Sequence, residues 1–178
     1  AEPDLVKRYG SIGRRLFHFA RGVDDRTVTP SSAPKSISAE TTFAEDIYNL
    51  DALCKRLWPL CETVSRRMKN RDLAGRSVTL KLKRSDFRQV TRSRTLSAPT
   101  QLAEIIYRTA VALLEKETNG PAYRLIGIGL ADILNAEDAD PPDLLQAETE
   151  KLTKVERAID DVRAKLGEDA ITKGRRWR

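Results

Sequence analysis

The sequence predicts an α+β fold in which two helices cover one face of a four-stranded antiparallel sheet. Between residues 36 and 134, some segments have the two-residue hydrophobic alternation of a strand and others have the three- to four-residue spacing of a helix. Their order is strand, helix, strand, strand, helix, strand. The chain of 178 residues is long enough for one such domain with a small flanking piece. Hydrophobic residues make up 40% of it and charged residues 33%, a balance typical of a folded, soluble protein. Two helices on one face leave the other face of the sheet open.

Four segments alternate between apolar and polar residues, as strands with one solvated face do. In the first of them, Ile37 and Phe43 fall on one side, and Ser36 and Glu40 fall on the other. A turn at residues 85–86 joins the second segment to the third, so these two are expected to form a hairpin. The predicted strands cover residues 36–43, 76–84, 89–96 and 123–134.

Two segments of the same domain have the helical period. Residues 51–70 carry an apolar stripe and end in basic residues, which suit the negative end of a helix dipole. Pro59 lies inside this segment and is expected to kink or split the helix. The second helix is expected to open at Pro99-Thr100 and to reach Glu117, with residues 119–121 as its stop.

The segments that flank this domain have different patterns. Apolar residues recur at helical spacing from Leu5 to Gly22, and Gly10 and Gly13 interrupt them, so two short helices joined by a tight turn fit as well as one. A proline-containing stretch without periodicity then indicates an extended linker. The expected organisation is helical residues 1–24, a linker at 25–35, the sheet domain at 36–134, and a tail at 135–178 with an amphipathic helix at 146–166.

Residue counts exclude several classes of site. Cys54 and Cys61 are the only cysteines, too few for a disulfide framework or a four-cysteine zinc site. His18 is the only histidine, so a histidine triad or a metal site with several histidines cannot form. We therefore predict no catalytic residues, no metal site and no cofactor in this chain. No apolar run approaches the roughly 20 residues that span a bilayer, and no signal peptide is visible at Ala1–Asp4. A cytoplasmic monomer without membrane contact is expected.

Positive charge concentrates in the predicted hairpin. Seven basic residues between Arg76 and Arg94 are opposed only by Asp86, so this stretch carries a charge equal to the net +6 of the whole chain. The period of two places the two lysines of one strand on a common face, and likewise Arg92 and Arg94 of the other. The seven residues are Arg76, Lys81, Lys83, Arg84, Arg88, Arg92 and Arg94.

Like charges at this spacing repel one another unless an anion compensates them, and a nucleic-acid backbone is the natural anion. Hydroxyl groups between the charges also hydrogen-bond phosphate oxygens; they belong to Thr79, Thr91, Ser93 and Thr95. The hairpin is therefore predicted to bind phosphates without reading base sequence. The alternative is a solvated edge hairpin that lysines keep from aggregating. Phe87 is the only aromatic residue between Thr79 and Thr95, so the sequence gives little support for base stacking.

Four segments resemble the C-terminal part of Y-family DNA polymerases, in the same order along the chain. Residues 35–43 (KSISAETTF) resemble the strand that opens the little-finger domain of that family, residues 91–95 (TRSRT) its DNA-contacting strand, and residues 124–130 (RLIGIGL) its last strand. Upstream, Tyr9-Gly10 with Gly13, Leu16 and the segment 20–24 resemble the end of the thumb in the polymerase IV branch of the family. The resemblance extends, with gaps, over residues 5–134.

The resemblance implies that the chain is the C-terminal portion of a translesion DNA polymerase, whose little finger grips primer–template DNA by phosphate contacts. It implies DNA binding by Lys35, Ser36, Thr91, Arg92, Ser93, Arg94, Gly10 and Gly13. Lys81, Lys83 and Arg84 join them on the charge argument. The parent protein is then expected to be a magnesium-dependent nucleotidyltransferase whose metal-binding palm is not in this sequence. This chain alone is expected to bind DNA without extending it.

Family members usually also carry a short peptide that binds the sliding clamp. Pro142-Asp143-Leu144-Leu145 lies at a suitable distance after the last strand, although Pro141 stands where the family has glutamine and no phenylalanine follows. Two interpretations of residues 142–145 stay open, a degenerate clamp-binding motif and an ordinary turn before the tail helix.

Two other classes of function also stay open. One is a protein-interaction module whose sheet face and helix at 152–166 dock partners while the basic strands are merely solvated. The other is a free-standing enzyme, which needs convergent titratable groups that the sequence does not offer. Binding of duplex DNA that weakens with salt favours the polymerase interpretation over the first of these.

Overall fold

Two units make up the chain in its computed structural model, Ala1–Ala33 and Pro34–Arg178. The structure describes residues 1–30, 32–118, 120–140 and 147–174. The first unit holds helices α1 (Glu2–Tyr9) and α2 (Ser11–Phe19), which confirms the two-helix alternative. Gly10 joins them with a φ of 60°, a left-handed conformation that favours glycine. Gly13 lets α2 approach α1 closely, because a β-carbon there would overlap the carbonyl oxygen of Leu5.

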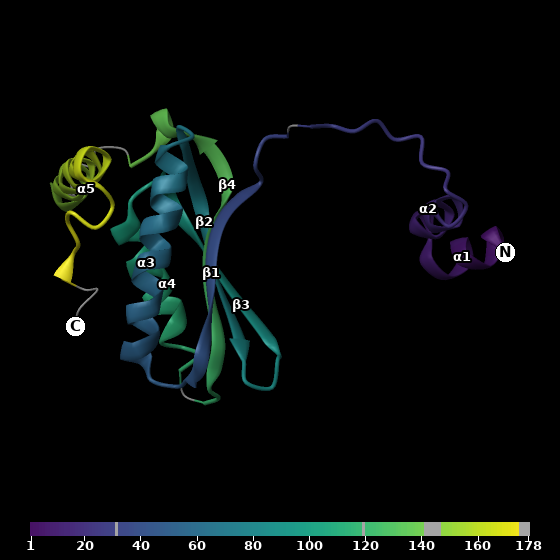
Figure 1. The fold of residues 1–178 in the computed structure, drawn as a ribbon, viewed down its shortest axis with the longest axis horizontal. Coiled ribbons are helices and arrows are strands. Elements are labelled where there is room, and N and C mark those ends of the chain that lie inside the picture. The colour runs from purple at the N-terminus through teal and green to yellow at the C-terminus, as the bar shows by residue number, and fades with distance from the viewer. Residues whose placement is uncertain (31, 119, 141–146, 175–178) are drawn as a thin grey trace. The chain divides into compact units, whose positions relative to one another are not determined.

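The second unit is built on one antiparallel sheet with the strand order β1-β4-β2-β3 (Figure 1). The strands are β1 (Ser36–Ile47), β2 (Leu73–Arg84), β3 (Gln89–Thr100) and β4 (Tyr123–Asn135), and a short 3-10 helix, η1 (Ala136–Asp138), follows β4. Their register places Leu80 of β2 between Ile128 of β4 and Arg92 of β3. The predicted fold class is confirmed.

Helices α3 (Leu50–Lys69) and α4 (Ala103–Leu114) cover one face of this sheet, as Figure 1 shows. Apolar residues of the two layers meet in one core, including Leu57 and Ile106 from the helices and Leu80 and Ile128 from the strands. Burying a side chain of this size stabilises the fold by about 1.5–3 kcal/mol. Alternate residues of each strand point the other way, so the opposite face of the sheet stays open.

α3 continues as one helix through Pro59, so of the two predicted alternatives, a kink or a split, the split is wrong. A proline in a helix interior removes a backbone hydrogen bond and costs roughly 3 kcal/mol. Leu57 and Trp58 before it and Cys61 after it are all buried, and packing of these side chains outweighs that cost. Asn49 caps the first turn of the helix with its side-chain oxygen.

α4 begins at Ala103, later than the predicted opening at Pro99-Thr100, and its last residue, Leu114, precedes the predicted end. Pro99 and Thr100 extend β3 instead. The hydroxyl of Thr100 accepts a hydrogen bond from the amide of Leu102 at 3.0 Å, just before the helix starts. The proline is tolerated there because it lies near the end of an edge strand.

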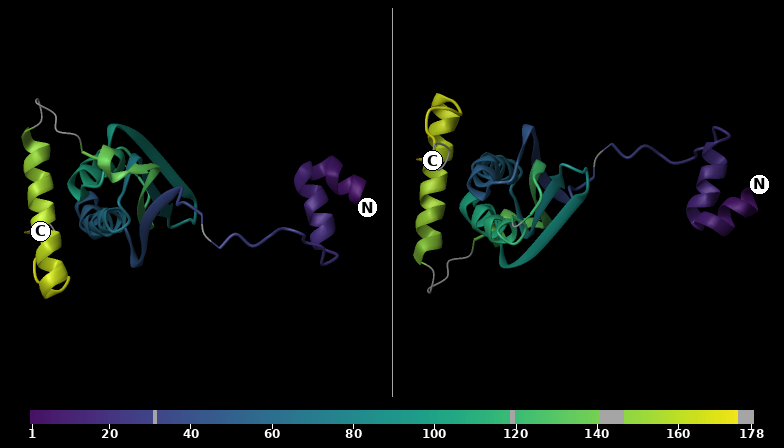
Figure 2. Two further views of the ribbon diagram at one scale, coloured as in Figure 1. Left: turned by 90° about the horizontal axis from the view of Figure 1, so that it is seen from above. Right: turned by 90° about the horizontal axis from the view of Figure 1, so that it is seen from below.

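The helix predicted in the tail is α5 (Ala147–Leu166), and it lies on the side of α3 and α4 that faces away from the sheet (Figures 1 and 2). Ionic contacts with α3 hold it there. Arg163 Nη2 lies 2.8 Å from Glu62 Oε1, and Lys69 Nζ lies 2.7 Å from Asp160 Oδ2. Its apolar stripe is only partly covered, since Leu166 is exposed.

Candidate nucleic-acid interface

The face of the sheet that no helix covers is formed by every second residue of the strands. Because Val78, Leu80 and Leu82 point into the core, the residues between them point away from it. The register places Thr91 of β3 beside Lys81 of β2. We call this surface the open face; it comprises Ser36, Ser38 and Glu40 of β1, Thr79, Lys81 and Lys83 of β2, Thr91 and Ser93 of β3, and Gly127 and Gly129 of β4.

Gly127 and Gly129 leave a hollow in the middle of the open face. Both belong to a central strand, and they contribute backbone without a side chain. A β-carbon on Gly127 would lie 2.9 Å from the β-carbon of Glu40, and one on Gly129 would lie 3.0 Å from that of Ser38. The hollow has a volume of about 340 Å³ and Lys81 lines it. A ligand can therefore approach the sheet backbone closely at this point.

Lys81 is held over the hollow by a weak ion pair. Its Nζ lies 2.8 Å from Oε2 of Glu40 across β4. Both side chains are solvent-accessible, so the pair contributes only about 0–1 kcal/mol. Thr79 and Ser93 share a hydrogen bond of 2.9 Å between their hydroxyl oxygens. Lys81 can therefore exchange Glu40 for a phosphate at little cost, and the two hydroxyls can turn to the same anion.

Arg92 and Arg94 share one face of β3, as predicted, but this is not the open face. They pair with Leu80 and Val78, whose side chains point toward the helices, so both arginines lie on the helix side of this edge strand. Arg92 Nε lies 2.7 Å from Oε1 of Glu117, beyond the end of α4. The structure thus places the predicted residues of β3 on two sides of the sheet, Thr91 and Ser93 on the open face and Arg92 and Arg94 on the helix side.

The remaining predicted residues lie in three places. Lys35 precedes β1, and Ser36 begins it and lines the hollow. Arg84 ends β2 at the hairpin turn, where its amide donates to the carbonyl oxygen of Arg88 at 2.9 Å. Gly10 and Gly13 belong to the first unit. The proposed clamp-binding residues, Pro142, Asp143, Leu144 and Leu145, lie outside the described residues, so clamp binding through them stays a prediction.

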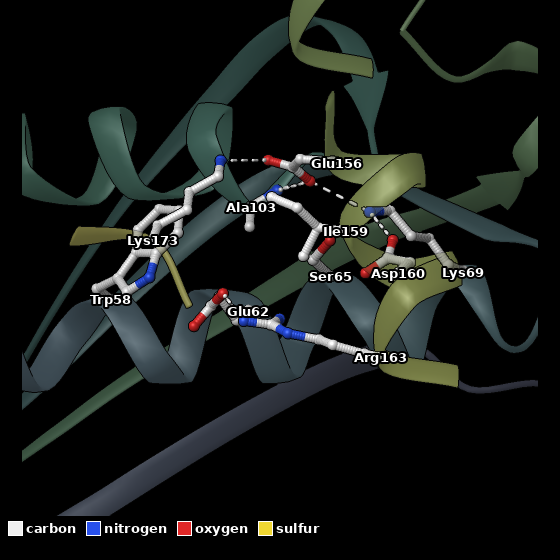
Figure 3. Close-up of a pocket in the computed structure, with 10 residues that line it drawn as sticks. All are labelled: Trp58, Glu62, Ser65, Lys69, Ala103, Glu156, Ile159, Asp160, Arg163 and Lys173. Carbon is white, nitrogen blue, oxygen red and sulfur yellow. Dashed lines mark hydrogen bonds and ion pairs between the residues drawn. The ribbon is translucent and has the colours of Figure 1, made fainter. Parts of the chain in front are cut away.

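A second polar cluster lies between α5 and the helix layer (Figure 3). The carboxylate of Glu156 accepts hydrogen bonds of 3.0 Å from the backbone amides of Ala103 and Glu104, at the start of α4. Lys69 Nζ and Lys173 Nζ lie 3.1 Å and 3.6 Å from the same carboxylate. The space that these side chains enclose, about 20 Å³, has room for little more than a water molecule. The cluster therefore caps α4 and anchors α5.

The other groups that could carry chemistry lack the setting for it. Burial raises the pKa of the Cys54 thiol, and it raises the pKa of Cys61 well above its usual range, so both thiols stay uncharged at neutral pH. Within the described ranges, no group of three or more His, Cys, Asp or Glu side chains could hold a metal ion. No helix in the part of the chain that the structure describes is both long and apolar enough to cross a membrane.

Sequence reasoning overlooked two features of these surfaces. The glycines of β4 form the floor of the hollow, and glycine inside a strand is a sequence signal for close approach of a ligand or another backbone. Glu156 is buried although it lies on the polar side of an amphipathic helix, and no sequence signal distinguishes it from the exposed acids of α5.

Residues 34–144 match the model of the C-terminal domain of the impB/mucB/samB family. The chain belongs to this family. Among curated relatives, DNA polymerase IV 1 of Mesorhizobium japonicum is 48% identical over 171 residues, and DNA polymerase IV of Brucella melitensis is 47% identical over 173 residues. These alignments cover 96% and 97% of the chain but 39% of each relative. The chain thus spans about two fifths of the length of these relatives.

The chain also resembles a solved structure, a Y-family DNA polymerase chimera, with a TM-score of 0.57. The match covers 76% of the chain and 39% of the chimera. At 14% sequence identity, this likeness shows a shared fold. The family match and the relatives confirm the resemblance inferred from the sequence. The chain is homologous to the C-terminal, little-finger region of Y-family DNA polymerase IV.

Proposed function

We propose that this member of the impB/mucB/samB family binds primer–template DNA by its phosphates and is the DNA grip of a translesion polymerase. The open face supports this proposal most directly, because Lys81 stands over a hollow whose floor is bare strand backbone, with Lys83 next to it on β2. Nucleotidyl transfer and its magnesium ions are proposed for the longer parent protein, and no chemical step is assigned to residues of this chain.

The position of β3 gives a phosphate backbone two sets of contacts. Because β3 is an edge strand, a DNA strand that runs along it can be reached from both of its sides. Thr91 and Ser93 offer hydroxyl donors from the open face, and Arg92 and Arg94 offer guanidinium donors from the helix side. All of these groups suit phosphate oxygens, so we expect binding without base preference.

The test is binding of the 178-residue chain to a fluorescent primer–template over a series of salt concentrations. The logarithm of the affinity falls linearly with the logarithm of salt concentration, with a slope of about −0.9 for each phosphate neutralised. We expect Arg92→Ala/Arg94→Ala and Lys81→Ala/Lys83→Ala each to weaken binding and to reduce the slope by about two phosphate contacts.

A matched control removes the same charge from another surface. Lys151→Ala/Arg157→Ala deletes two exposed cations of α5, and we expect it to keep the slope of the unsubstituted chain. Equal losses in all three variants would contradict the proposed interface. An unsubstituted chain that binds without a salt slope, or does not bind, would contradict the proposed function.

The alternative of a protein-interaction module has less support from the fold. α5, which the alternative uses to dock partners, is held on its own domain through Glu156 and Arg163. The open face carries the ammonium groups of Lys81 and Lys83 and the hydroxyl groups of β2 and β3, which suit an anion. The salt series distinguishes the two functions, because the alternative predicts either no binding of DNA or binding that does not depend on salt.

We also propose a cytoplasmic location and the sliding clamp as a second partner. Both cysteines are free, as expected in a reducing compartment. The clamp proposal depends on the resemblance of residues 142–145 to the clamp peptide of the family.

A further inference from the structure

The tip of the β2–β3 hairpin exposes an aromatic side chain on a strained backbone. Phe87 has a φ of 67° and is 62% exposed. The left-handed region favours glycine or asparagine and is unusual for a bulky residue. The turn around it is well formed, since its amide donates to the carbonyl oxygen of Arg84 at 3.0 Å and the amide of Arg88 donates to Asp86 Oδ1 at 3.0 Å. Strained backbone of this kind clusters at functional sites.

Three basic residues lie close to the ring of Phe87, two by contact and one as its neighbour in the sequence. The guanidinium carbon of Arg124 lies 4.1 Å from the ring centre, and Lys83 Nζ lies 5.3 Å from it. Arg88 is the next residue in the chain and is exposed. We call Lys83, Phe87, Arg88 and Arg124 the tip cluster. Asp86, 3.6 Å from Arg88, is the acidic residue of the turn, so positive charge dominates around the ring.

A β-bulge directs Arg124 to this place. β4 pairs Leu125 with Lys83 but Tyr123 with Arg84, so Arg124 is an extra residue in the ladder. The register with β1 also shifts between Leu125 and Tyr123. A bulge changes the direction of a side chain, and here it places the guanidinium group of Arg124 over the ring of Phe87 in the β2–β3 turn. Two independent irregularities, a left-handed phenylalanine and a bulged arginine, thus meet at one point.

We infer that the tip cluster binds an unpaired nucleotide next to the duplex that the open face holds. Proteins that bind single strands combine cations along the backbone with aromatic rings on which bases stack. Bases stack on arginine planes as well as on aromatic rings. Phe87 and Arg124 offer the stacking surfaces, and Lys83 and Arg88 the phosphate contacts. The inference rests on the proposed function, since Lys83 belongs to both the open face and the tip cluster.

The experiment compares two DNA probes, a blunt duplex and the same duplex with a single-stranded overhang. We expect the unsubstituted chain to bind the overhang probe more tightly. Phe87→Gly removes the ring and also relieves the left-handed strain, so we expect a thermal midpoint no lower than that of the unsubstituted chain. Its affinity for the overhang probe should fall by about 5- to 100-fold, while affinity for the blunt duplex stays unchanged.

Two further variants separate stacking from general effects. Phe87→Trp keeps a stacking surface and should retain affinity for the overhang probe. Tyr48→Ala removes an exposed aromatic ring between β1 and α3, and it should change neither affinity.

The outcomes distinguish this inference from the proposed function. Equal affinity of the unsubstituted chain for both probes, with a normal salt slope, would overturn the inference and leave the proposed function standing. A lower thermal midpoint of Phe87→Gly with equal losses on both probes would show that the ring serves the hairpin fold, and would also overturn the inference. Absence of a salt slope on either probe would contradict the proposed function itself.

Discussion

Gly127 and Gly129 set how closely a ligand can approach the centre of the open face. We expect Gly127→Ala to destabilise the domain by about 1–3 kcal/mol, because the new β-carbon would lie 2.9 Å from that of Glu40 on the neighbouring strand. The same methyl group fills part of the hollow, so affinity for primer–template DNA should also fall. Urea unfolding and DNA binding of the folded variant measure the two effects separately.

Gly120 provides the control for this substitution. A β-carbon there would have no neighbour within 4 Å, so Gly120→Ala should change neither stability nor affinity. Full DNA affinity of a folded Gly127→Ala variant would mean that DNA does not enter the hollow. The alternation of β4 predicts that both glycines share a face with each other. Their closeness to Glu40 and Ser38 depends on pairing with a strand far away in the sequence, which the pattern of one strand does not reveal.

Glu156 anchors α5 to the start of α4. It is 5% exposed, it accepts two backbone hydrogen bonds from the start of α4, and it faces the ammonium groups of Lys69 and Lys173. We expect Glu156→Ala to lower the free energy of unfolding by about 2–3 kcal/mol, because it leaves buried donors and two partly buried cations without this partner. Urea denaturation measures this loss.

The matched control lies on the same helix. Glu150 is exposed and forms an i,i+4 ion pair of 2.6 Å with Lys154, so Glu150→Ala should cost no more than about 0.5 kcal/mol. Similar losses for the two variants would contradict the anchoring role of Glu156. The sequence assigns both acids to the polar side of an amphipathic helix. Only the docking of that helix on α4 makes one of them a helix cap.

At the scale of elements, the sequence predicts the type and order of every strand and helix between residues 36 and 134. This succeeds because alternation and helical stripes follow from the burial of each element on its own. The prediction fails where packing competes with a local signal. Pro59 remains inside α3 because its neighbours are buried on both sides, and Pro99-Thr100 ends a strand rather than opening a helix.

The hairpin shows how far the candidate site could be predicted. The period of two correctly groups Lys81 with Lys83 and Arg92 with Arg94. The turn pairs Lys83 with Gln89, and this register places Arg92 beside Leu80, on the helix side of the sheet. The face that each pair occupies therefore depends on the geometry of the turn. In this turn Phe87 adopts a left-handed conformation, which is not predicted for a phenylalanine.

At the scale of the whole sheet unit, α3 and α4 separate two surfaces with different tasks. The open face lies on one side of the sheet, and α5 lies beyond the helices on the other side, as both views in Figure 2 show. DNA binding and attachment of α5 should therefore be separable by truncation. Residues 141–178 carry nine basic and eight acidic residues, so their removal barely changes the net charge.

We therefore expect a chain that ends after Asp140 to bind primer–template DNA with the affinity and salt slope of the full chain. It should unfold at lower urea concentration, because α4 loses the cap supplied by Glu156 and Trp58 loses the cover of Lys173, whose Nζ lies 5.0 Å from its ring. A folded truncated chain whose salt slope drops by two or more phosphate contacts would assign part of the DNA grip to the tail. Unchanged binding with reduced stability instead means that α5 serves the fold and that the residues up to Asp140, which include the open face and the edge of β3, grip the DNA.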